Sequence, residues 1–305
     1  MTTSHHHAHV VRPSKGAGYY GQLIGAHAIL ICYTMVALFP VLLIVINSFK
    51  SRREIFGQPL KPALPGGLGS EAGATNWLLS GSFDTVGYET VIQRGNFDIY
   101  FRNSIVVTLG ALFLILLTGT MASFALSEYK FRGNTLMGLY LAIGIMVPIR
   151  LGTVSLLRLM KTLELVDTLW ALILVYTAQG LPLAVFIMTE FMRAVPRDLK
   201  DAARVDGASE YRIYGMILPL VRPALGTVAV FNMIPIWNDL WFPLVMAQGE
   251  NVKTVTLGAN QFLGQFESDW NAVLASLSLS MVPVVILYII FSRQLIRGLT
   301  SGAVK

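Results

Sequence analysis

The sequence has few charged residues. Only 13% of its 305 residues are Asp, Glu, Lys or Arg, whereas a soluble domain carries about 25%. Hydrophobic residues make up 54% of the chain, and the mean hydropathy is +0.61. This composition excludes a disordered chain, disfavours a soluble enzyme and indicates an integral membrane protein. The formal net charge of +6 is then better explained by basic loops beside a membrane than by nucleic-acid binding.

Other features are missing as well. Cys32 is the single cysteine, so no intrachain disulfide can form and a disulfide scaffold is excluded. The sequence holds no GxxxxGK[ST] phosphate-binding loop and therefore no evident ATP site of its own. His27 is the only histidine outside the tract at residues 5–9, and it has no His/Asp or His/Glu ligand spacing. We expect neither a metal site nor a catalytic centre, and we interpret the tract as a mobile tail.

What the chain does contain is six long stretches with almost no charge. A helix needs about 20 apolar residues to cross the hydrocarbon core of a bilayer. We therefore predict an all-α integral membrane protein, with a transmembrane domain over residues 26–293. The six expected spans lie at about residues 26–48, 103–127, 135–157, 168–190, 222–246 and 270–292.

The distribution of Lys and Arg gives an expected orientation. Placing both tails, residues 1–25 and 294–305, in the cytoplasm puts slightly more basic residues inside than outside. The N-terminus is polar, and the first apolar run is too long for a signal peptide, so no cleavable leader is expected. Residues 49–101 form a long Pro- and Gly-rich excursion on the opposite side, and long loops translocate with less regard to charge.

The segment at residues 191–221 is too long and too charged for a simple connection between spans. Pro196 suits the first turn of a helix, and Asp201 lies near the positive end of that helix. Gly207 ends the helix, because only glycine enters the left-handed region without penalty. Ser209 can cap a second short helix. We predict a helix–bend–helix on the inner membrane face, either an interfacial anchor or a knob that fits a groove in a partner.

This segment resembles the "EAA" signature of permease subunits of ATP-binding-cassette importers. The matching residues are Asp201, Ala202, Ala203, Arg204, Val205, Asp206, Gly207 and Ala208, followed by Ile217, Leu218 and Pro219. Other stretches resemble the carbohydrate branch, specifically the second permease of maltose-type importers; they lie at residues 47–50, 103–104, 237–244 and 297–305. The resemblance covers nearly the whole chain after about residue 20.

The segment departs from the family pattern in two respects. Asp201 stands where the signature usually has Glu, which keeps the charge and loses one methylene of reach. The chain also has one residue fewer between Gly207 and the Leu218–Pro219 pair. On a helix, one missing residue rotates all later residues by about 100°.

The resemblance implies a transport subunit of the bacterial inner membrane that forms half of an import pore and is not an enzyme. It implies that this chain binds no cofactor, and that separate ATPase subunits use ATP and Mg. The implied partners are a second permease in a heterodimer, two cytoplasmic ATPase subunits, a periplasmic solute-binding protein and membrane lipid, with no nucleic acid. Residues 247–269 resemble the loop that probes the binding protein, and residues 298–305 resemble tails along the ATPase interface.

The resemblance also assigns the coupling loop, residues 191–221, to the ATPase. Its short helices would dock in a cleft of that subunit, with Asp201 beside a basic residue of the ATPase, and closure of the ATPase dimer would move the loop. The implied docking residues are Asp201, Ala202, Ala203, Asp206, Gly207 and Ala208.

Residues that could contact a sugar are harder to identify from the sequence, because aromatic and polar side chains in membrane spans also have structural roles. The candidates are Arg150, Asn232, Trp237, Asn238, Asp239 and Trp241. Trp241 equally fits an interfacial belt, and Arg150 with Asp239 equally fits a structural ion pair. Two other functions remain open: a permease for a non-sugar solute, and a membrane scaffold or channel without an ATPase.

Overall fold

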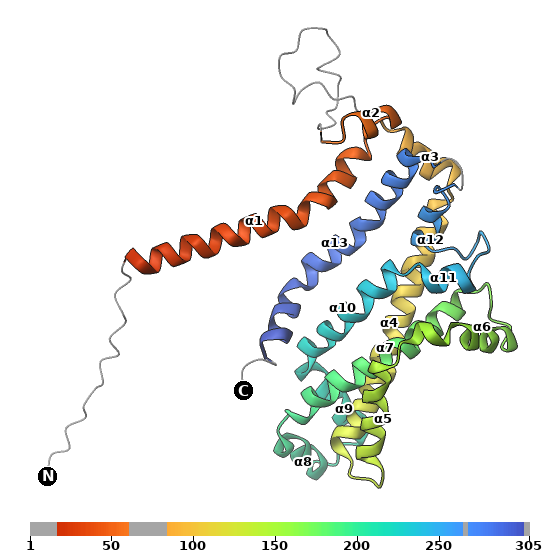
Figure 1. Cartoon of the computed structure of the whole chain (residues 1–305). Helices are drawn as coiled ribbons and strands as arrows, with labels where there is room; N and C mark the ends of the chain where they lie inside the picture. Colours follow the sequence, from red (N-terminus) through yellow and green to blue (C-terminus); the bar gives the residue numbers. More distant parts are fainter. Residues whose placement is uncertain (1–16, 61–83, 265–267, 302–305) are drawn as a thin grey trace.

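The structure is a computed structural model that describes residues 17–60, 84–264 and 268–301. Every regular element in these ranges is a helix, so the expected all-α class is confirmed (Figure 1). The histidine tract at residues 5–9 lies outside the described residues. The helices are α1 (Ala17–Asn47), α2 (Arg52–Gly57), α3 (Val86–Arg94), α4 (Phe97–Glu128), α5 (Asn134–Met146), η2 (Ile149–Gly152), α6 (Thr153–Thr162), α7 (Leu169–Arg193), α8 (Arg197–Val205), α9 (Glu210–Leu220), α10 (Arg222–Asn238), α11 (Trp241–Met246), α12 (Val255–Asn260) and α13 (Trp270–Ser301).

Three of the described helices are long and apolar enough to cross a membrane. They are the stretches Tyr19–Asn47, Phe97–Glu128 and Leu169–Arg193. Two further candidates are helix pairs with a bend, so up to five spans are present if each pair counts as one. The apolar stretch Trp270–Ile286 at the start of α13 is shorter. Six spans therefore remain a prediction, and α1 begins nine residues before the first expected span.

The expected span over residues 135–157 is bent in the structure. α5 and the η2–α6 segment are bent by 86° at a break over Val147 and Pro148. Val147 is extended, with φ −77° and ψ 117°, because the ring of a following proline disfavours the α conformation. The chain therefore turns here instead of continuing through the bilayer as one rod.

The expected span over residues 222–246 is also broken, between α10 and α11 at Asp239. Pro243 has no backbone N–H to donate to the carbonyl oxygen of Asp239, and its ring would collide with that carbonyl in a continuous helix. Asp239 instead takes an extended conformation, with ψ 132°, and its carbonyl accepts a hydrogen bond from Thr256 Oγ1 at 2.7 Å.

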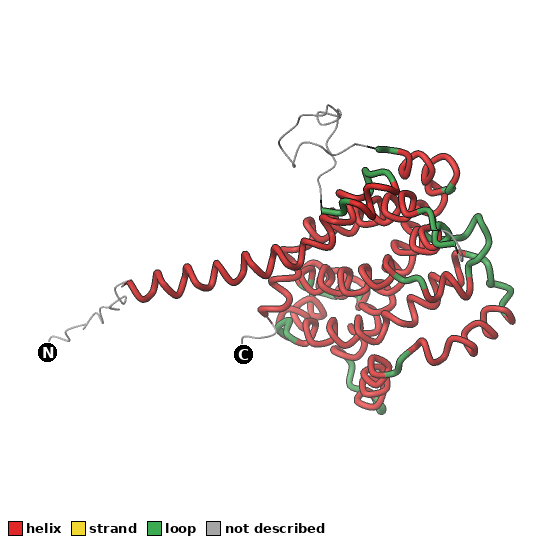
Figure 2. The backbone as a smooth tube through the Cα atoms, turned by 45° about the horizontal axis from the view of Figure 1, so that its top comes forward, coloured by secondary structure: helices red, strands yellow, loops and turns green. Residues whose placement is uncertain are grey.

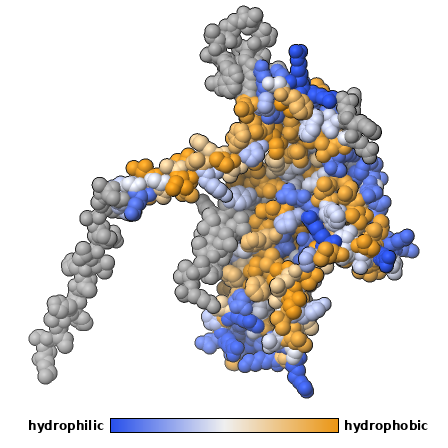
Figure 3. Space-filling model, in the orientation of Figure 1, coloured by the Kyte–Doolittle hydropathy of each residue, from blue (hydrophilic) through white to orange (hydrophobic). Residues whose placement is uncertain are grey.

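The core lies where α4 and α7 pack along each other and α10 crosses them. Fully buried side chains such as Ile115, Leu172 and Val228 come from these three helices. α1 contacts α13 and otherwise projects away from the bundle in both ribbon views (Figures 1 and 2). Hydrophobic residues cover much of the middle of the face in Figure 3, and hydrophilic residues gather near α2 and near α8. The outside of the bundle thus has the apolar character that a lipid environment requires.

Gly180 sets the spacing between α7 and α10. A Cβ atom at this position would overlap Asn232 Oδ1 and lie 2.5 Å from Ile115 Cδ1. Neither neighbour can move aside freely, because Ile115 is fully buried and the Asn232 amide donates to Val228 O at 2.9 Å.

Gly180→Ala should therefore lower the free energy of unfolding by about 1–3 kcal/mol, the usual cost of overpacking a core. The matched control is Gly215→Ala in α9, where an added Cβ meets nothing within 4 Å. That change should instead stabilise by about 0.5–1 kcal/mol, since alanine is the better helix former. Thermal unfolding in mild detergent measures both, and equal effects of the two changes would contradict the close approach.

Candidate functional site

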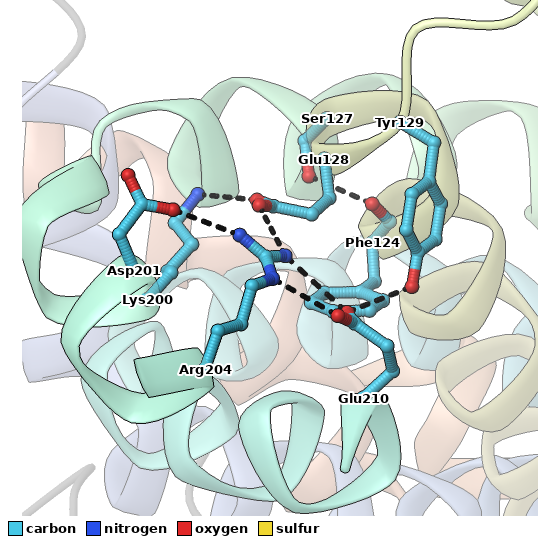
Figure 4. A network of polar contacts seen from close by, with 8 residues as sticks. All are labelled: Phe124, Ser127, Glu128, Tyr129, Lys200, Asp201, Arg204 and Glu210. Atoms are coloured by element: carbon cyan, nitrogen blue, oxygen red, sulfur yellow. Dashed lines mark hydrogen bonds and ion pairs between the residues drawn. The ribbon is translucent and has the colours of Figure 1, made fainter. Parts of the chain in front are cut away.

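An ion-pair network joins α8 and α9 to the end of α4 (Figure 4). Glu128 is the last residue of α4, and its side chain is only 10% exposed. It accepts hydrogen bonds from Lys200 Nζ at 2.8 Å and from Arg204 Nη2 at 2.6 Å. We call the set Glu128, Tyr129, Lys200, Asp201, Arg204 and Glu210 the Glu128 network.

Arg204 is the centre of this network. Its Nε donates to Glu210 Oε1 at 3.0 Å, and its Nη1 donates to Asp201 Oδ1 at 3.0 Å. The hydrogen bonds to Glu210 and Glu128 raise the pKa of the Arg204 guanidinium above its ordinary value. Tyr129 Oη also donates to Glu210, at 2.8 Å, and burial together with this bond raises the pKa of Tyr129 to about 12. Both donors therefore keep their protons throughout the neutral pH range.

The base of the helix pair is buried. The Lys200 side chain is 4% exposed, so its ammonium depends on Glu128 for charge compensation. On α9, Ile213 and Ile217 are buried in the core, and the hydroxyl of Tyr214 lies 2.7 Å from that of Thr120 on α4. Apolar packing and buried charge together fix the pair to α4.

The α8–α9 knob, defined here as Arg197–Leu220, has an exposed outer side. Gly207 joins the two helices with φ +77°, the left-handed conformation expected from the sequence. Val205 is 87% exposed and Tyr211 is 83% exposed, so the outer side of the knob carries two large apolar side chains. Ser209 occupies the N-cap position of α9 but makes no side-chain capping bond.

The predicted docking residues separate into two groups. Four are exposed on the outer side of the knob: Asp201, Ala202, Asp206 and Gly207. The other two, Ala203 and Ala208, are half-buried and pack against the core. Within this chain Asp201 pairs with Arg204 at 3.0 Å, and the contact of Asp201 with a basic residue of the ATPase stays a prediction.

Sequence reasoning did not find the residues that hold the knob in place. Glu128 was visible only as a carboxylate at the end of an apolar run, and Lys200 and Glu210 only as charges in a charged loop. Tyr211 was not singled out by the sequence. The pairing of Glu128 with Lys200 joins positions 72 residues apart, which no local pattern encodes.

A cavity of about 820 Å³ lies between α5, η2, α7 and α10. Its walls are mostly apolar and include the rings of Tyr140 and Phe231. The polar groups on the walls are Arg150, Tyr176, Gln179 and Asn232. An apolar cavity with a few convergent polar groups is typical of a small-molecule site. Gln179, in the middle of α7, is exposed and was missed by the sequence analysis.

Arg150 and Asp239 form an ion pair, with Arg150 Nη2 3.1 Å from Asp239 Oδ1. The Asp239 side chain is 7% exposed and also accepts hydrogen bonds from Tyr176 Oη at 2.9 Å and from Phe242 N at 3.0 Å. The Arg150 side chain is 66% exposed and lines the cavity. Arg150 and Asp239 therefore form an ion pair and Arg150 also lines the cavity, while its contact with a sugar stays a prediction.

The remaining candidates have different surroundings. Asn232 lines the cavity, whereas Trp237, Asn238, Asp239 and Trp241 are not among its lining residues. Trp237 is buried and donates to Ser280 O at 3.0 Å, a contact that ties α10 to α13. Asn238 is exposed at the end of α10. Trp241 is partly exposed and donates to Thr153 Oγ1 at 2.9 Å, which joins α11 to α6.

Comparison with known proteins gives a consistent result. Residues 115–301 match the family described as "Binding-protein-dependent transport system inner membrane component". The arabinooligosaccharides transport system permease protein AraQ of Halalkalibacterium halodurans is 35% identical over 214 residues, which is 70% of this chain and 76% of that protein. The diacetylchitobiose uptake system permease protein NgcG of Streptomyces coelicolor is 29% identical over 92% of this chain and 88% of that protein.

The fold also has a solved counterpart. A chain from the crystal structure of a bacterial ABC transporter involved in the import of the acidic polysaccharide alginate superposes with a TM-score of 0.73. The match covers 92% of this chain and 99% of that chain at 20% sequence identity. The two chains therefore share their fold over nearly their whole length.

Removing the charge of Glu128 should loosen the knob. In Glu128→Gln, the ammonium of Lys200 stays buried without its carboxylate, which costs about 3–5 kcal/mol for a buried pair. We expect faster hydrogen exchange at the amides of α8. Asp201→Asn is the control, because that side chain is 64% exposed and its pair should contribute less than about 1 kcal/mol. Equal protection of α8 in both variants would contradict the assigned role of Glu128.

The two single substitutions that break the Arg150–Asp239 pair should lower the free energy of unfolding by different amounts. Arg150→Gln leaves a buried carboxylate without its cation and should destabilise the chain by about 3–5 kcal/mol. Asp239→Asn should cost less, because the freed Arg150 is already 66% exposed. A double-mutant cycle on thermal unfolding should give a coupling energy of about 0.5–3 kcal/mol. Additive effects would show that the pair contributes nothing to stability.

Proposed function

Because the chain belongs to the family of binding-protein-dependent transport system inner membrane components, we propose that it forms half of the translocation path of an ATP-driven sugar importer. The chain is a transport subunit, and members of this family are not enzymes. Sugar as the solute is supported by the names of its relatives, which take up arabinooligosaccharides and diacetylchitobiose.

The α8–α9 knob would be the contact with the ATPase. The observation that carries this proposal is the combination of a buried, charge-compensated base with an exposed outer side that holds Val205 and Tyr211. A projection that is rigid at its base and apolar at its tip is suited to a groove in another protein. Asp201, Ala202, Asp206 and Gly207 would lie in that interface on the cytoplasmic side.

The cavity between α5, α7 and α10 would be this subunit's part of the solute path. Arg150 keeps hydrogen-bond donors free for hydroxyl groups while Asp239 compensates its charge, so a neutral solute meets no net charge at this point. Tyr140 and Phe231 provide rings for contact with the apolar faces of a sugar. Asn232 and Gln179 supply amides that can donate and accept hydrogen bonds.

The assembly would need further chains. A second permease would supply the other half of the path and a neighbour for α1, whose side chains are exposed along most of its length. Two ATPase subunits would bind ATP and Mg, and a periplasmic binding protein would deliver the solute. This chain would bind no cofactor.

The proposal predicts that Val205→Glu weakens ATPase binding and uptake together. A buried valine contributes about 1.5–3 kcal/mol, so its loss should lower affinity by at least about tenfold. The measurement is recovery of the ATPase with the detergent-solubilised complex, beside ATP-dependent sugar uptake by proteoliposomes containing all partners. The fold should be unaffected, because Val205 is 87% exposed within this chain.

The matched control is Val86→Glu, the same change at a 55% exposed position on α3, at the opposite end of the molecule. ATPase recovery should be normal in this variant. Normal recovery and uptake in Val205→Glu would reject the knob as the docking site. Uptake of only non-sugar solutes by the intact complex would favour the alternative permease function, and function without any ATPase would favour a channel.

A further inference from the structure

A second cavity, of about 320 Å³, lies between α5, α7 and the end of α4. One end is polar and is lined by Asn134 and Arg193, and the other is apolar and is lined by Ala142 and Val185. Eight residues separate Asn134 from Ala142 on α5, which corresponds to about 12 Å along the helix. The cavity is therefore elongated and amphipathic.

The polar end of this cavity lies beside the ends of two long apolar helices. α7, a candidate membrane span, ends at Arg193, and α4, another candidate, ends at Glu128. In a membrane this is the level of the lipid headgroups, and the apolar end of the cavity lies at the level of the acyl chains.

Charges of both signs stand side by side at the polar end. Arg193 Nη1 lies 3.0 Å from Glu190 Oε1, and the two side chains are 52% and 63% exposed. The guanidinium has further N–H groups that can bind a phosphate. α5 begins beside it without a side-chain cap, so the positive end of its dipole adds to the attraction for an anion. Glu190 in turn favours a cation at the neighbouring position.

The wall also contains a buried hydroxyl without a partner. Thr189 lines the cavity and is 7% exposed, and among the described residues its Oγ1 has no hydrogen bond. The usual partner of a helical threonine is the carbonyl four residues earlier, here Val185 O. That oxygen already accepts a bond from Ser123 Oγ at 3.2 Å in addition to the helix bond. The Thr189 hydroxyl is therefore an unsatisfied polar group of a residue in the cavity wall.

We propose that this cavity binds one phospholipid with a zwitterionic aminophosphate headgroup. The phosphate would lie against Arg193 and the start of α5, and the amine would lie against Glu190. An acyl chain would follow Leu139 and Phe186, which are 56% and 54% exposed, toward Ala142. A headgroup with only negative charge fits less well, because it would place that charge beside Glu190. This proposal depends on the membrane location of the chain and not on its solute or its ATPase.

The test uses the complete complex purified in mild detergent, with retained lipid measured by native mass spectrometry. Wild type should retain phosphatidylethanolamine in preference to phosphatidylglycerol when both are supplied equally. Gly138→Leu should lower retention by at least about tenfold, equivalent to 1.4 kcal/mol. Gly138 lines the cavity, and an added Cβ there meets nothing within 4 Å, so a larger side chain can enter the space that the lipid would occupy. Gly25→Leu on α1, which is equally open, is the control and should leave retention unchanged.

Two charge variants test the orientation of the headgroup. Arg193→Gln should lower retention of both lipids, whereas Glu190→Gln should remove or reverse the preference for phosphatidylethanolamine. Unchanged retention in Gly138→Leu would overturn the site. Equal loss in Gly25→Leu would overturn it as well, and a cross-link from Thr135→Cys to another subunit would show that protein covers the cavity. Sugar uptake is measured separately, so loss of the lipid site and failure of the proposed transport function are distinguishable.

Discussion

Glu128 is the acceptor on which the placement of the α8–α9 knob depends. Its carboxylate compensates a lysine that is nearly inaccessible to water and shares an arginine with two other acids. Apolar contacts of α9 hold that helix on α4, but α8 is short and polar and has little apolar surface of its own to bury. The ion pairs with Glu128 at the end of α4 therefore fix the orientation of α8, which apolar packing alone would not determine.

A second buried carboxylate, Asp239, has a comparable place in the middle of the molecule. It sits where the α10–α11 helix is interrupted, and its arginine partner sits directly after the interruption between α5 and α6. Trp241 and Thr153 join the same two segments by another hydrogen bond. Helical backbone hydrogen bonds are thus interrupted in both segments in the same region of the molecule. Side chains from each interrupted segment make polar contacts with the other. The interruption after α5 also forms part of the wall of the larger cavity, through Pro148 and Arg150.

The sequence was informative where the physics is local. Apolar runs marked the long helices, because a surface facing lipid tolerates few polar groups. Gly207 marked the bend, because its left-handed backbone conformation favours glycine. Pro148 and Pro243 were visible in the sequence, but the sequence analysis did not predict a break at either position. The long-range hydrogen bonds could not be predicted from the sequence. No local pattern around Glu128 indicates its bond to Lys200, and none around Asp239 indicates its bond to Tyr176. Val205 was identified only as one residue of the signature, because α8 has nine residues, too few for its periodicity to show which side is covered.

The geometry around Arg204 has a mechanical consequence. The guanidinium is a flat, rigid group, and it is bonded to carboxylates from α4, α8 and α9 at once. If one of these segments shifts, either the other two shift with it or a charged hydrogen bond breaks. A lysine at this position would be more flexible and could keep its contacts during such a shift. The knob is therefore rigid, and a force applied at its tip is transmitted directly to α4. From α4 the force passes to α7, which packs along α4.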